Sequence, residues 1–444
     1  MTKLVRFDDV WSLVLEAIHE TGTKHLADKE LWFVRDLVGR VRMLIPVDDE
    51  EPAAEDDFAL QGPWSQLTEA IARRLGSRAY EPSQSFLAVP RAQLEDLQRY
   101  SIRHTIDDVS IVFVDRLVTG GEWTAVSETS RPGRPLRFTL FSIKGGVGRS
   151  TTAAVLASHL ALQGSRVLLI DLDLESPGLS SSLLEPDRHP RYGVVDWFVE
   201  DLVGQGKEVL PQIVGRPSWH QTLFGDVLVV PAYGSDWGEY LAKLGRVYMS
   251  TPSAGAADMS WPRRLGRLLD SLEEQEKPDV VLIDSRNGLH DLAAVTVTAI
   301  DAHVLLFALD SDAMWNGYRV LFEHWRRYNV VTRIRERLSL VAAYVPADAG
   351  EHEYLNRYRG RAWDLFRDNL YDEVSPQVSD VFQQDPFSFA LTDEGAPHDP
   401  LPIYWHEGLQ RLPSLRELPE TAVTLAYKRF LDRFDDLMRS LREA

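Results

Sequence analysis

The residues Phe141-Ser-Ile-Lys-Gly-Gly-Val-Gly-Arg-Ser-Thr-Thr152 are the most informative stretch of the chain. They follow an apolar run and precede a helical pattern at 153–160, so the glycines are predicted to lie in a turn between a strand and a helix. In such a turn, backbone N–H groups point at phosphate oxygens and the helix start adds partial positive charge. The alternative is a tight turn with helix-capping serine and threonine. The pattern differs from G-x-x-x-x-G-K-[ST] by having Arg149 at the lysine position, with Lys144 five residues earlier.

Apolar runs alternate with helical patterns on both sides of this loop. Nearly continuous apolar runs are typical of strands buried on both faces, and the intervening helices supply the crossovers that parallel pairing requires. The pattern therefore predicts a doubly wound α/β fold with a mostly parallel sheet, in which ligands bind where the strands end. The runs are 137–143, 166–171, 227–232, 279–284, 302–309 and 339–345.

Acidic residues end two of these runs. Two aspartates close the second run in LLIDLDLESPGL (168–179), and Asp284 closes the fourth in DVVLIDSRNGL (279–289). Carboxylates beside a phosphate loop suit ligation of Mg²⁺ through water or orientation of an attacking water. For the first segment the alternative is an Asx-type turn leading into Pro177-Gly178. Arg286 is either a cation near the terminal phosphate or an ordinary surface arginine, and spacing alone favours the second interpretation.

The stretches IKGGVGRSTTAAVLASHLA, LLIDLDLESPGL, VLVVPA and VVLIDSRNGL occur in this order and together resemble the deviant P-loop ATPases of the MinD/ParA type. The loop is most similar to the subgroup that reads KGGVGR instead of KGGVGK. The resemblance covers about 136–345 and extends at most to 415. It implies a P-loop NTPase fold, ATP and Mg²⁺ as cofactors, and weak ATP hydrolysis by an ATP-dependent homodimer.

The resemblance also implies roles for individual residues. Lys144 corresponds to the signature lysine that reaches the partner subunit's phosphates across a nucleotide-sandwiched dimer. Asp173 would position the hydrolytic water, and Asp284 would hold Mg²⁺ through water. Arg149, Lys144 and Asp173 are thus the expected catalytic residues, and Ser150, Asp173 and Asp284 the expected metal site. The expected nucleotide cradle consists of Gly145, Gly146, Val147, Gly148, Arg149, Ser150 and Thr151, whose hydroxyl would lie near the α-phosphate.

Two departures from the family pattern affect these expectations. Arg149 is planar, bulky and permanently charged, so it can bind phosphate oxygens bidentately but does not replace a compact ammonium. We expect nucleotide binding with an altered hydrolysis rate. The sequence also has neither the Asn-Arg pair that often follows the sixth strand in the family nor the [NT]-K-x-D pattern of GTPases. Pro346 and Asp348 of AAYVPAD (342–348) stand in that place, so adenine is implied by the resemblance alone.

The chain on either side of this region is predicted to form two further parts. Residues 1–130 form an N-terminal α+β domain of unknown role, with helices at 8–21, 28–45 and 63–75 and a strand at 111–115. A break at 131–135 (RPGRP) separates it from the ATPase domain at 136–415. Residues 416–444 form an amphipathic helix whose polar face mixes both charge signs, which favours docking on the protein's own core over membrane binding.

Composition narrows the possible classes of protein. The 444 residues contain no cysteine, which excludes disulfides, cysteine-ligated iron–sulfur clusters and the cluster-carrying relatives that need them. The C-terminal segment 427–444 has one tyrosine, whereas tyrosine kinases built on this fold usually end in a tyrosine-rich tail, so a kinase of that type is not favoured. A charged N-terminus and no apolar run of about 18 residues predict a soluble, cytoplasmic protein without a membrane span.

These observations lead to one preferred function and two alternatives. The preferred function is an ATP-gated dimerisation switch with weak Mg²⁺-dependent ATPase activity, coupled by the N-terminal domain to an unknown protein partner. The first alternative is a nucleotide-gated scaffold without hydrolysis. The second is a DNA-partitioning protein, but the net charge of -19 and nearby acids favour a salt-bridged surface over nucleic acid binding. That alternative depends on Arg319, Arg326, Arg327, Arg333, Arg335 and Arg337.

Overall fold

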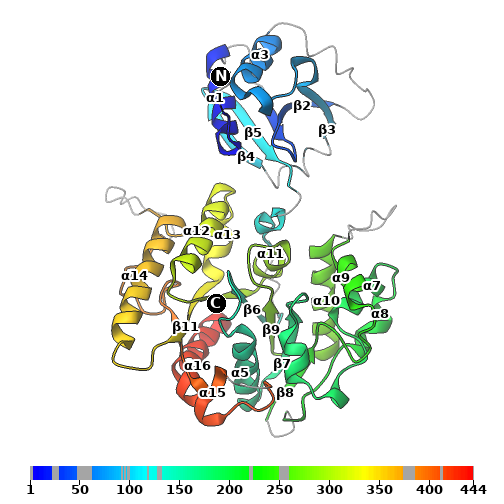
Figure 1. Cartoon of the computed structure of the whole chain (residues 1–444), viewed down its shortest axis with the longest axis vertical. Coiled ribbons are helices and arrows are strands. Elements are labelled where there is room, and N and C mark those ends of the chain that lie inside the picture. The colour runs from blue at the N-terminus through cyan, green and yellow to red at the C-terminus, as the bar shows by residue number, and fades with distance from the viewer. Residues whose placement is uncertain are drawn as a thin grey trace. The chain divides into compact units, whose positions relative to one another are not determined.

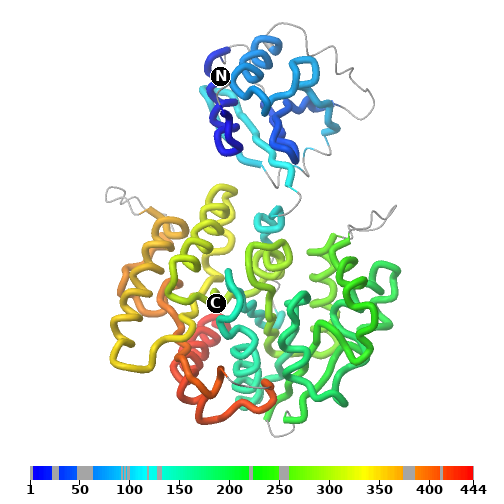
Figure 2. Tube along the Cα trace, in the orientation of Figure 1, coloured from blue at the N-terminus to red at the C-terminus, as the bar shows by residue number. Residues whose placement is uncertain are grey.

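The computed structural model divides the chain into two compact units, Met1–Thr124 and Ala125–Ala444. Figures 1 and 2 show the two units in colours that run from blue to red along the chain. The predicted break at 131–135 lies partly outside the described residues. The structure describes residues 4–22, 30–47, 63–91, 94, 97, 101–117, 120–127, 133–219, 224–249, 260–373, 386–410 and 414–443.

The N-terminal unit is a five-stranded mixed sheet in the order β3-β2-β1-β5-β4. Alternate strand residues face opposite sides. Phe33 and Ile111 therefore pack with α1 (Val10–Thr21) and α3 (Pro63–Leu75), whereas Trp32 and Val112 belong to a smaller apolar cluster. The expected α+β architecture is confirmed. The strands are β1 (Glu30–Arg35), β2 (Val41–Val47), β3 (Phe86–Pro90), β4 (Ser101–Ile106) and β5 (Val109–Asp115).

The helix predicted over 28–45 is wrong, because the described residues of this segment, from Glu30 onward, lie in the antiparallel strands β1 and β2 and the turn between them. Its apolar residues are mostly aromatic or β-branched, which favours strands. The segment also contains a turn, in which Gly39 has a φ of +84° and the Asp36 carboxylate accepts hydrogen bonds from the backbone N–H groups of Val38 and Arg40. Helical spacing of the apolar residues was therefore a coincidence of two short strands joined by a turn.

The second unit contains a seven-stranded sheet in the order β12-β11-β10-β6-β9-β7-β8, and all its neighbouring strands are parallel. The six predicted strands are confirmed. The seventh, β12, was missed because its apolar run is only four residues long and contains a proline. The strands are β6 (Leu136–Ser142), β7 (Arg166–Leu172), β8 (Asp226–Val230), β9 (Val280–Ser285), β10 (His303–Ala308), β11 (Leu338–Val345) and β12 (Leu401–Tyr404).

Helices cover both faces of this sheet (Figure 1). Two neighbouring residues of β6 face opposite sides of the sheet and contact different helices. The ring of Phe138 lies 4.9 Å from that of Phe434 in α16, and the Thr139 hydroxyl donates to Thr296 O in α11 at 2.7 Å. The helices are α5 (Arg149–Leu162), α6 (Gly178–Leu183), α7 (Val194–Asp201), α8 (Gly206–Val209), α9 (Tyr240–Val247), α10 (Trp261–Glu276), α11 (Asp291–Thr298), α12 (Asp312–Arg327), α13 (Val331–Ile334), α14 (Glu351–Asn369), α15 (Glu407–Gln410) and α16 (Glu420–Glu443).

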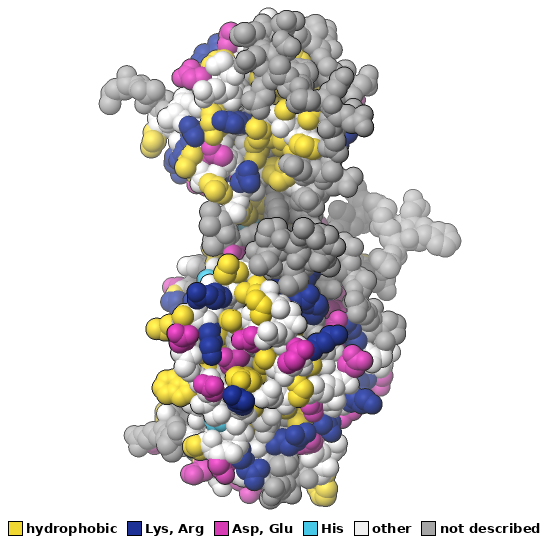
Figure 3. All heavy atoms as spheres, turned by 90° about the vertical axis from the view of Figure 1, so that its right-hand side faces the viewer, with side chains coloured by type: hydrophobic (Ala, Val, Ile, Leu, Met, Phe, Trp, Pro, Cys, Tyr) yellow, Lys and Arg dark blue, Asp and Glu magenta, His cyan; other side chains and the backbone are white. Residues whose placement is uncertain are grey.

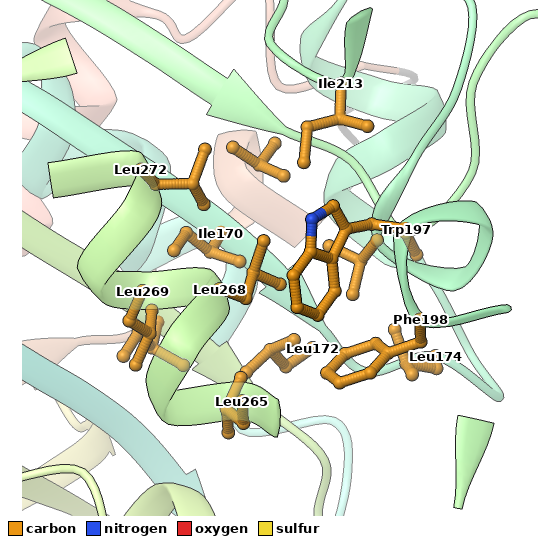
Figure 4. Packing of buried hydrophobic residues seen from close by; sticks show 14 of the residues in the cluster. Ile170, Leu172, Leu174, Trp197, Phe198, Ile213, Leu265, Leu268, Leu269 and Leu272 are labelled. Atoms are coloured by element: carbon orange, nitrogen blue, oxygen red, sulfur yellow. The ribbon is translucent and has the colours of Figure 1, made fainter. Parts of the chain in front are cut away.

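The core beneath β7 fixes the strand that carries the acidic loop. Ile170 and Leu172 point to the same side of β7 and lie in one apolar cluster with Leu268 of α10 and Trp197 of α7 (Figure 4). Complete burial of side chains of this size contributes about 1.5–3 kcal/mol each to folding. The end of β7 is therefore held rigidly beside the end of β9.

The C-terminal helix docks on the unit's own core, as its mixed polar face predicted. Tyr427, Phe430, Phe434 and Met438 are buried along one side of α16, and the Tyr427 hydroxyl lies 3.1 Å from that of Thr152 in α5. Among the described residues, no helix is long and apolar enough to cross a membrane. Basic and acidic side chains are mixed over the face of the second unit drawn in Figure 3.

Candidate nucleotide site

The phosphate loop joins the end of β6 at Ser142 to the start of α5 at Arg149. Gly146 and Gly148 have φ angles of +77° and +81°, in the left-handed region that favours glycine. The Ser142 hydroxyl donates to Lys144 O at 2.8 Å and fixes the start of the loop. Val147 is buried, while Lys144, Gly145 and Gly146 are exposed on the rim. The left-handed glycines agree with the glycine-rich turn predicted between a strand and a helix, and phosphate binding by this turn stays a prediction.

Arg149 connects the last residue of β9 with the loop that follows β7. Its side chain is only 6% exposed; one terminal nitrogen donates to Ser285 O, and Nη2 lies 3.2 Å from Oδ2 of Asp173. The guanidinium makes these two contacts through two different nitrogens, whereas a lysine would have to make both through its single ammonium nitrogen. Two of the predicted catalytic residues, Arg149 and Asp173, are therefore in direct contact.

Ser150 and Asp284 meet beneath the loop. The Ser150 hydroxyl donates to Oδ2 of Asp284 at 2.5 Å, and the buried Oδ1 of Asp284 has no hydrogen-bond partner among the described residues. Burial raises the pKa of Asp284, while the Arg149 charge and the Ser150 hydrogen bond oppose the shift. A buried carboxylate oxygen without a partner beside a hydroxyl suits a hydrated Mg²⁺ ion.

The described residues contain no group of three or more His, Asp or Glu side chains arranged to hold a metal by themselves. Magnesium in nucleotide sites is commonly held by one or two protein oxygens together with substrate phosphates and water. Ser150 and Asp284 match this kind of site. The place of Asp173 in the predicted metal set remains a prediction, because its carboxylate is engaged by Arg149.

The two aspartates that end β7 have different surroundings. Oδ2 of Asp171 accepts hydrogen bonds from the N–H and hydroxyl of Ser180 at 3.0 and 2.7 Å, and Oδ1 accepts the N–H of Asp173 at 3.2 Å. Burial, followed by the charge of Asp284, raises the pKa of Asp171 to about 7. Asp171 therefore holds the loop in place and closes it against α6, while Asp173 is left to face Arg149.

The carboxyl group of Asp173 binds a proton more tightly than an ordinary aspartate does. Burial raises its pKa to about 6, although the neighbouring Arg149 charge acts in the opposite direction. A carboxyl that titrates just below neutral pH accepts a proton more readily than an ordinary aspartate. The position at the end of β7, beside the phosphate loop, is the one predicted from the sequence.

A second ion pair lies nearer the surface and joins the loops that follow β9 and β7. Arg286, after β9, pairs with Glu175, which lies two residues beyond Asp173. The Tyr248 hydroxyl donates to Oε1 of Glu175 at 2.9 Å, and the Tyr240 hydroxyl donates to Leu174 O at 2.7 Å. The sequence analysis did not predict a role for Glu175, Tyr240 or Tyr248. Glu175 lies within the motif LLIDLDLESPGL, but the two tyrosines belong to no motif that could have indicated them.

Pro346 and Asp348, the residues predicted to contact the base, lie outside the cavity next to the phosphate loop. Beside Thr151 lies a cavity of about 20 Å³, and Pro346 and Asp348 are not among the described residues that line it. The Asp348 carboxylate accepts the N–H of Gly350 at 2.9 Å, just before α14 begins. Their contact with a base remains a prediction. The cavity is lined by Gly148, Thr151, Tyr344, Ile403, Tyr404, His406, Leu409, Gln410 and Tyr427.

Several known proteins resemble this chain. An iron-sulfur cluster carrier protein of Pseudomonas fragi is 28% identical over 166 residues, which are 35% of this chain and 55% of the relative. The chain thus spans about half the length of this curated relative.

Solved structures resemble the chain at lower identity. Apo McdA from Cyanthece is 18% identical and covers 68% of this chain and 99% of its own, with a TM-score of 0.40. The MinD cell division protein of Aquifex aeolicus is 15% identical and covers 68% of this chain and 97% of its own, with a TM-score of 0.41. Cobyrinic acid a,c-diamide synthase of Mycobacterium smegmatis, solved with an ATP analogue and magnesium, is 22% identical and covers 53% of this chain and 78% of its own, with a TM-score of 0.35.

The family itself is established by a match over most of the second unit. The model of the CobQ/CobB/MinD/ParA nucleotide binding domain matches residues 138–439, a range that begins in β6 and ends in α16. It includes the phosphate loop, both acidic strand ends and the Arg149 bridge described above. The chain therefore belongs to the CobQ/CobB/MinD/ParA nucleotide-binding family of P-loop ATPases.

Proposed function

We propose that the second unit binds ATP with Mg²⁺, hydrolyses it slowly and acts as an ATP-gated dimerisation switch of the KGGVGR type. The observation that carries this proposal is the meeting of Arg149, Asp173, Ser150 and Asp284 at the carboxyl ends of three adjacent parallel strands. In parallel sheets this edge is where ligands bind. Retained acidic residues in contact with the loop favour hydrolysis over a chemically silent scaffold.

Each side chain has a distinct task in this function. The loop N–H groups and the start of α5 bind the phosphates, and Arg149 offsets their charge from beneath. Ser150 and Asp284 hold Mg²⁺, which neutralises charge that develops on the transferred phosphoryl group. Asp173 orients the attacking water, and its raised pKa makes it a suitable proton acceptor.

The exposed Lys144 fits a contact outside its own subunit. It lies on the rim of the loop, whereas Arg149 supplies the buried positive charge. A second copy placed against this rim would receive the Lys144 ammonium near its nucleotide. We propose that ATP thereby favours association, and that the N-terminal unit transmits the dimeric state to a protein partner. The cluster-carrying role of the Pseudomonas relative is not part of the proposal, because the chain has no cysteine.

The test combines catalysis with association. Phosphate release is measured on the purified full chain with ATP and with GTP, in the presence and absence of Mg²⁺, while light scattering follows the molar mass. We expect slow, Mg²⁺-dependent release that prefers ATP, and a dimer only with ATP. ATP binding and dimerisation without phosphate release would identify the non-hydrolysing scaffold instead. The absence of nucleotide binding would contradict both functions.

A further inference from the structure

The ion pair between Arg286 and Glu175 lies at the candidate site but has no role in the function described so far. Arg286 belongs to the loop after β9 and Glu175 to the loop after β7, and each side chain is 27% exposed. The pair therefore differs from the buried bridge between Arg149 and Asp173, whose side chains are 6% and 8% exposed. Exposed pairs of this kind contribute little to stability, about 0–1 kcal/mol.

The Arg286 loop runs along the start of the phosphate loop. The Gly288 N–H donates to Ser142 O at 2.9 Å, and a Cβ placed on Gly145 would lie 3.1 Å from the side-chain nitrogen of Asn287. The backbone that carries Arg286 is thus held against the exposed rim of the phosphate loop. Its guanidinium contacts a carboxylate only two residues from Asp173, the residue proposed to orient water.

Glu175 keeps another hydrogen-bond donor when Arg286 leaves it. The Tyr248 hydroxyl donates to the same carboxylate oxygen, Oε1, at 2.9 Å. Burial and the Glu175 charge raise the pKa of Tyr248, so this donor stays neutral and protonated at physiological pH. Since Glu175 is also partly solvated, separating it from Arg286 would not leave a buried, unpaired charge.

The two arginines of the site are therefore suited to different tasks. Arg149 is enclosed and fixed by two acceptors, whereas Arg286 is partly exposed and pairs with the carboxylate of Glu175. A terminal phosphate carries more negative charge than a carboxylate and offers three oxygens, so it competes well for a guanidinium. We propose that Arg286 binds the terminal phosphate of ATP, and that Glu175 holds its guanidinium when no nucleotide is bound.

This inference rests on the proposed function and makes Arg286 the residue that distinguishes ATP from ADP. ADP lacks the terminal phosphate and leaves Arg286 on Glu175. When ATP binds, the Arg286 guanidinium moves to the terminal phosphate. Glu175 then keeps only the hydrogen bond from Tyr248, at the end of α9, of these two contacts. The two members of the ion pair then have opposite effects on ATP affinity, which is not expected of a pair that only stabilises the loops.

The test is calorimetric titration of the full chain with a non-hydrolysable ATP analogue and with ADP. We expect Arg286→Ala to weaken binding of the analogue about tenfold, the size of one lost charge-assisted contact, and to change ADP binding less than twofold. Glu175→Gln keeps an acceptor for Tyr248 but removes the competing charge, so it should strengthen binding of the analogue severalfold and leave ADP unchanged. The double variant should behave as Arg286→Ala does.

A matched control and the contrary outcomes complete the test. Arg367→Ala removes an exposed arginine of α14 that pairs with Asp364 and Asp368, and it should change neither affinity. If Arg286→Ala and Glu175→Gln both weaken the two ligands equally, or neither changes the ratio of affinities, the pair is only structural and the inference is wrong while the proposed function stands. If the wild type binds neither ligand, both are wrong.

Discussion

Nη2 of Arg149 lies 3.2 Å from Oδ2 of Asp173, so the residue expected to bind phosphate and the residue expected to position water contact each other directly. Any nucleotide that enters the loop must share the guanidinium with this carboxylate. We therefore expect the arginine of the loop to affect both the phosphate affinity and the pKa of Asp173, which the Arg149 charge lowers.

Replacing Arg149 should separate these two effects. We expect Arg149→Ala to weaken ATP binding about tenfold or more, because it removes a charge-assisted contact worth about 1.5–3 kcal/mol. Arg149→Lys should retain binding but hydrolyse ATP faster, since one ammonium nitrogen replaces the two guanidinium nitrogens that hold Asp173 and Ser285 O and should restrain Asp173 less firmly. Calorimetry and phosphate release measure the two properties, and an unchanged dissociation constant for Arg149→Ala would refute the role in phosphate binding.

Lys144 should be needed for association and dispensable for nucleotide binding. It is exposed on the loop rim, so we expect Lys144→Ala to bind ATP nearly as the wild type does, but to remain monomeric and release no phosphate. Light scattering with and without ATP measures the association. Lys207→Ala, at an exposed lysine of α8, is the control and should dimerise normally. A dimer that forms equally with and without ATP in both variants would contradict the switch.

Asp173→Ala should give the opposite result. Without the carboxylate the attacking water is not oriented, so we expect phosphate release to stop while ATP still binds and the dimer persists. The loss of Asp173 leaves Arg149 with Ser285 O as an acceptor, which keeps the guanidinium in the site. Single-turnover phosphate release and light scattering at saturating ATP measure both effects. Hydrolysis at the wild-type rate would remove Asp173 from the catalytic residues.

The sequence was sufficient for the sheet and the phosphate loop because both depend on local patterns. Continuous apolar runs predicted six strands, and a glycine-rich turn between a strand and a helix predicted the cradle. The prediction of a helix over 28–45 was wrong because the apolar residues of two short strands and the turn between them happen to have helical spacing. The strand β12 was missed because a four-residue run carries too little pattern.

The side-chain contacts of the site could not be predicted in the same way. The bond between Arg149 and Asp173 joins residues that are close in space because β6, β9 and β7 are neighbours in the sheet, which no single motif shows. Spacing likewise did not determine where Arg286 points. Tyr240 and Tyr248 stabilise the acidic loop from α9 and its end, far along the chain from the motif.

His303 should make the stability of the protein depend on pH away from the nucleotide site. Burial, helped by the nearby Arg337 charge, lowers its pKa to about 3 from 6.5. Between these values the unfolded chain binds a proton that the folded chain does not, so stability falls as pH falls below about 6.5, by up to about 1.4 kcal/mol per pH unit.

The measurement is urea unfolding of the full chain at pH 7.5 and 5.5. We expect the wild type to lose about 1 kcal/mol more free energy of unfolding between these pH values than His303→Gln does. The glutamine can still hydrogen-bond to the Ser339 hydroxyl, which lies 2.9 Å from Nε2 of His303. His352→Gln, at an exposed position of α14, should keep the wild-type difference. Equal pH dependence in the wild type and His303→Gln would show that His303 does not titrate in this way.

The structure also bears on the arginine-rich segment that raised the possibility of nucleic acid binding. These arginines do not lie on one continuous helix, because α12 ends at Arg327, Asn329 has a φ of +55° and the short helix α13 begins only at Val331. Arg335 pairs with Asp372 at 2.5 Å, and Arg337 lies 3.6 Å from Asp301.

Acidic side chains also lie among the arginines of α12. Arg319, Arg326 and Arg327 line a cavity of about 580 Å³ together with Glu323 and Asp368. Arg326 additionally donates to the backbone oxygen of Asp368 at 2.8 Å. A phosphate backbone in this place would meet carboxylates as well as guanidinium groups, and the chain as a whole carries a net charge of -19.

We therefore expect the protein not to bind DNA, even under the most permissive conditions. These are low salt, saturating ATP and Mg²⁺, and the Asp173→Ala protein, which should accumulate as a dimer. Nonspecific binding to DNA depends on release of counterions from phosphates and is strongest at low salt, so a real interaction would be visible in a gel-shift assay there. A shift that requires ATP, weakens steeply with salt and disappears when Arg319 and Arg327 are replaced by alanine would overturn this expectation and favour the DNA-partitioning alternative.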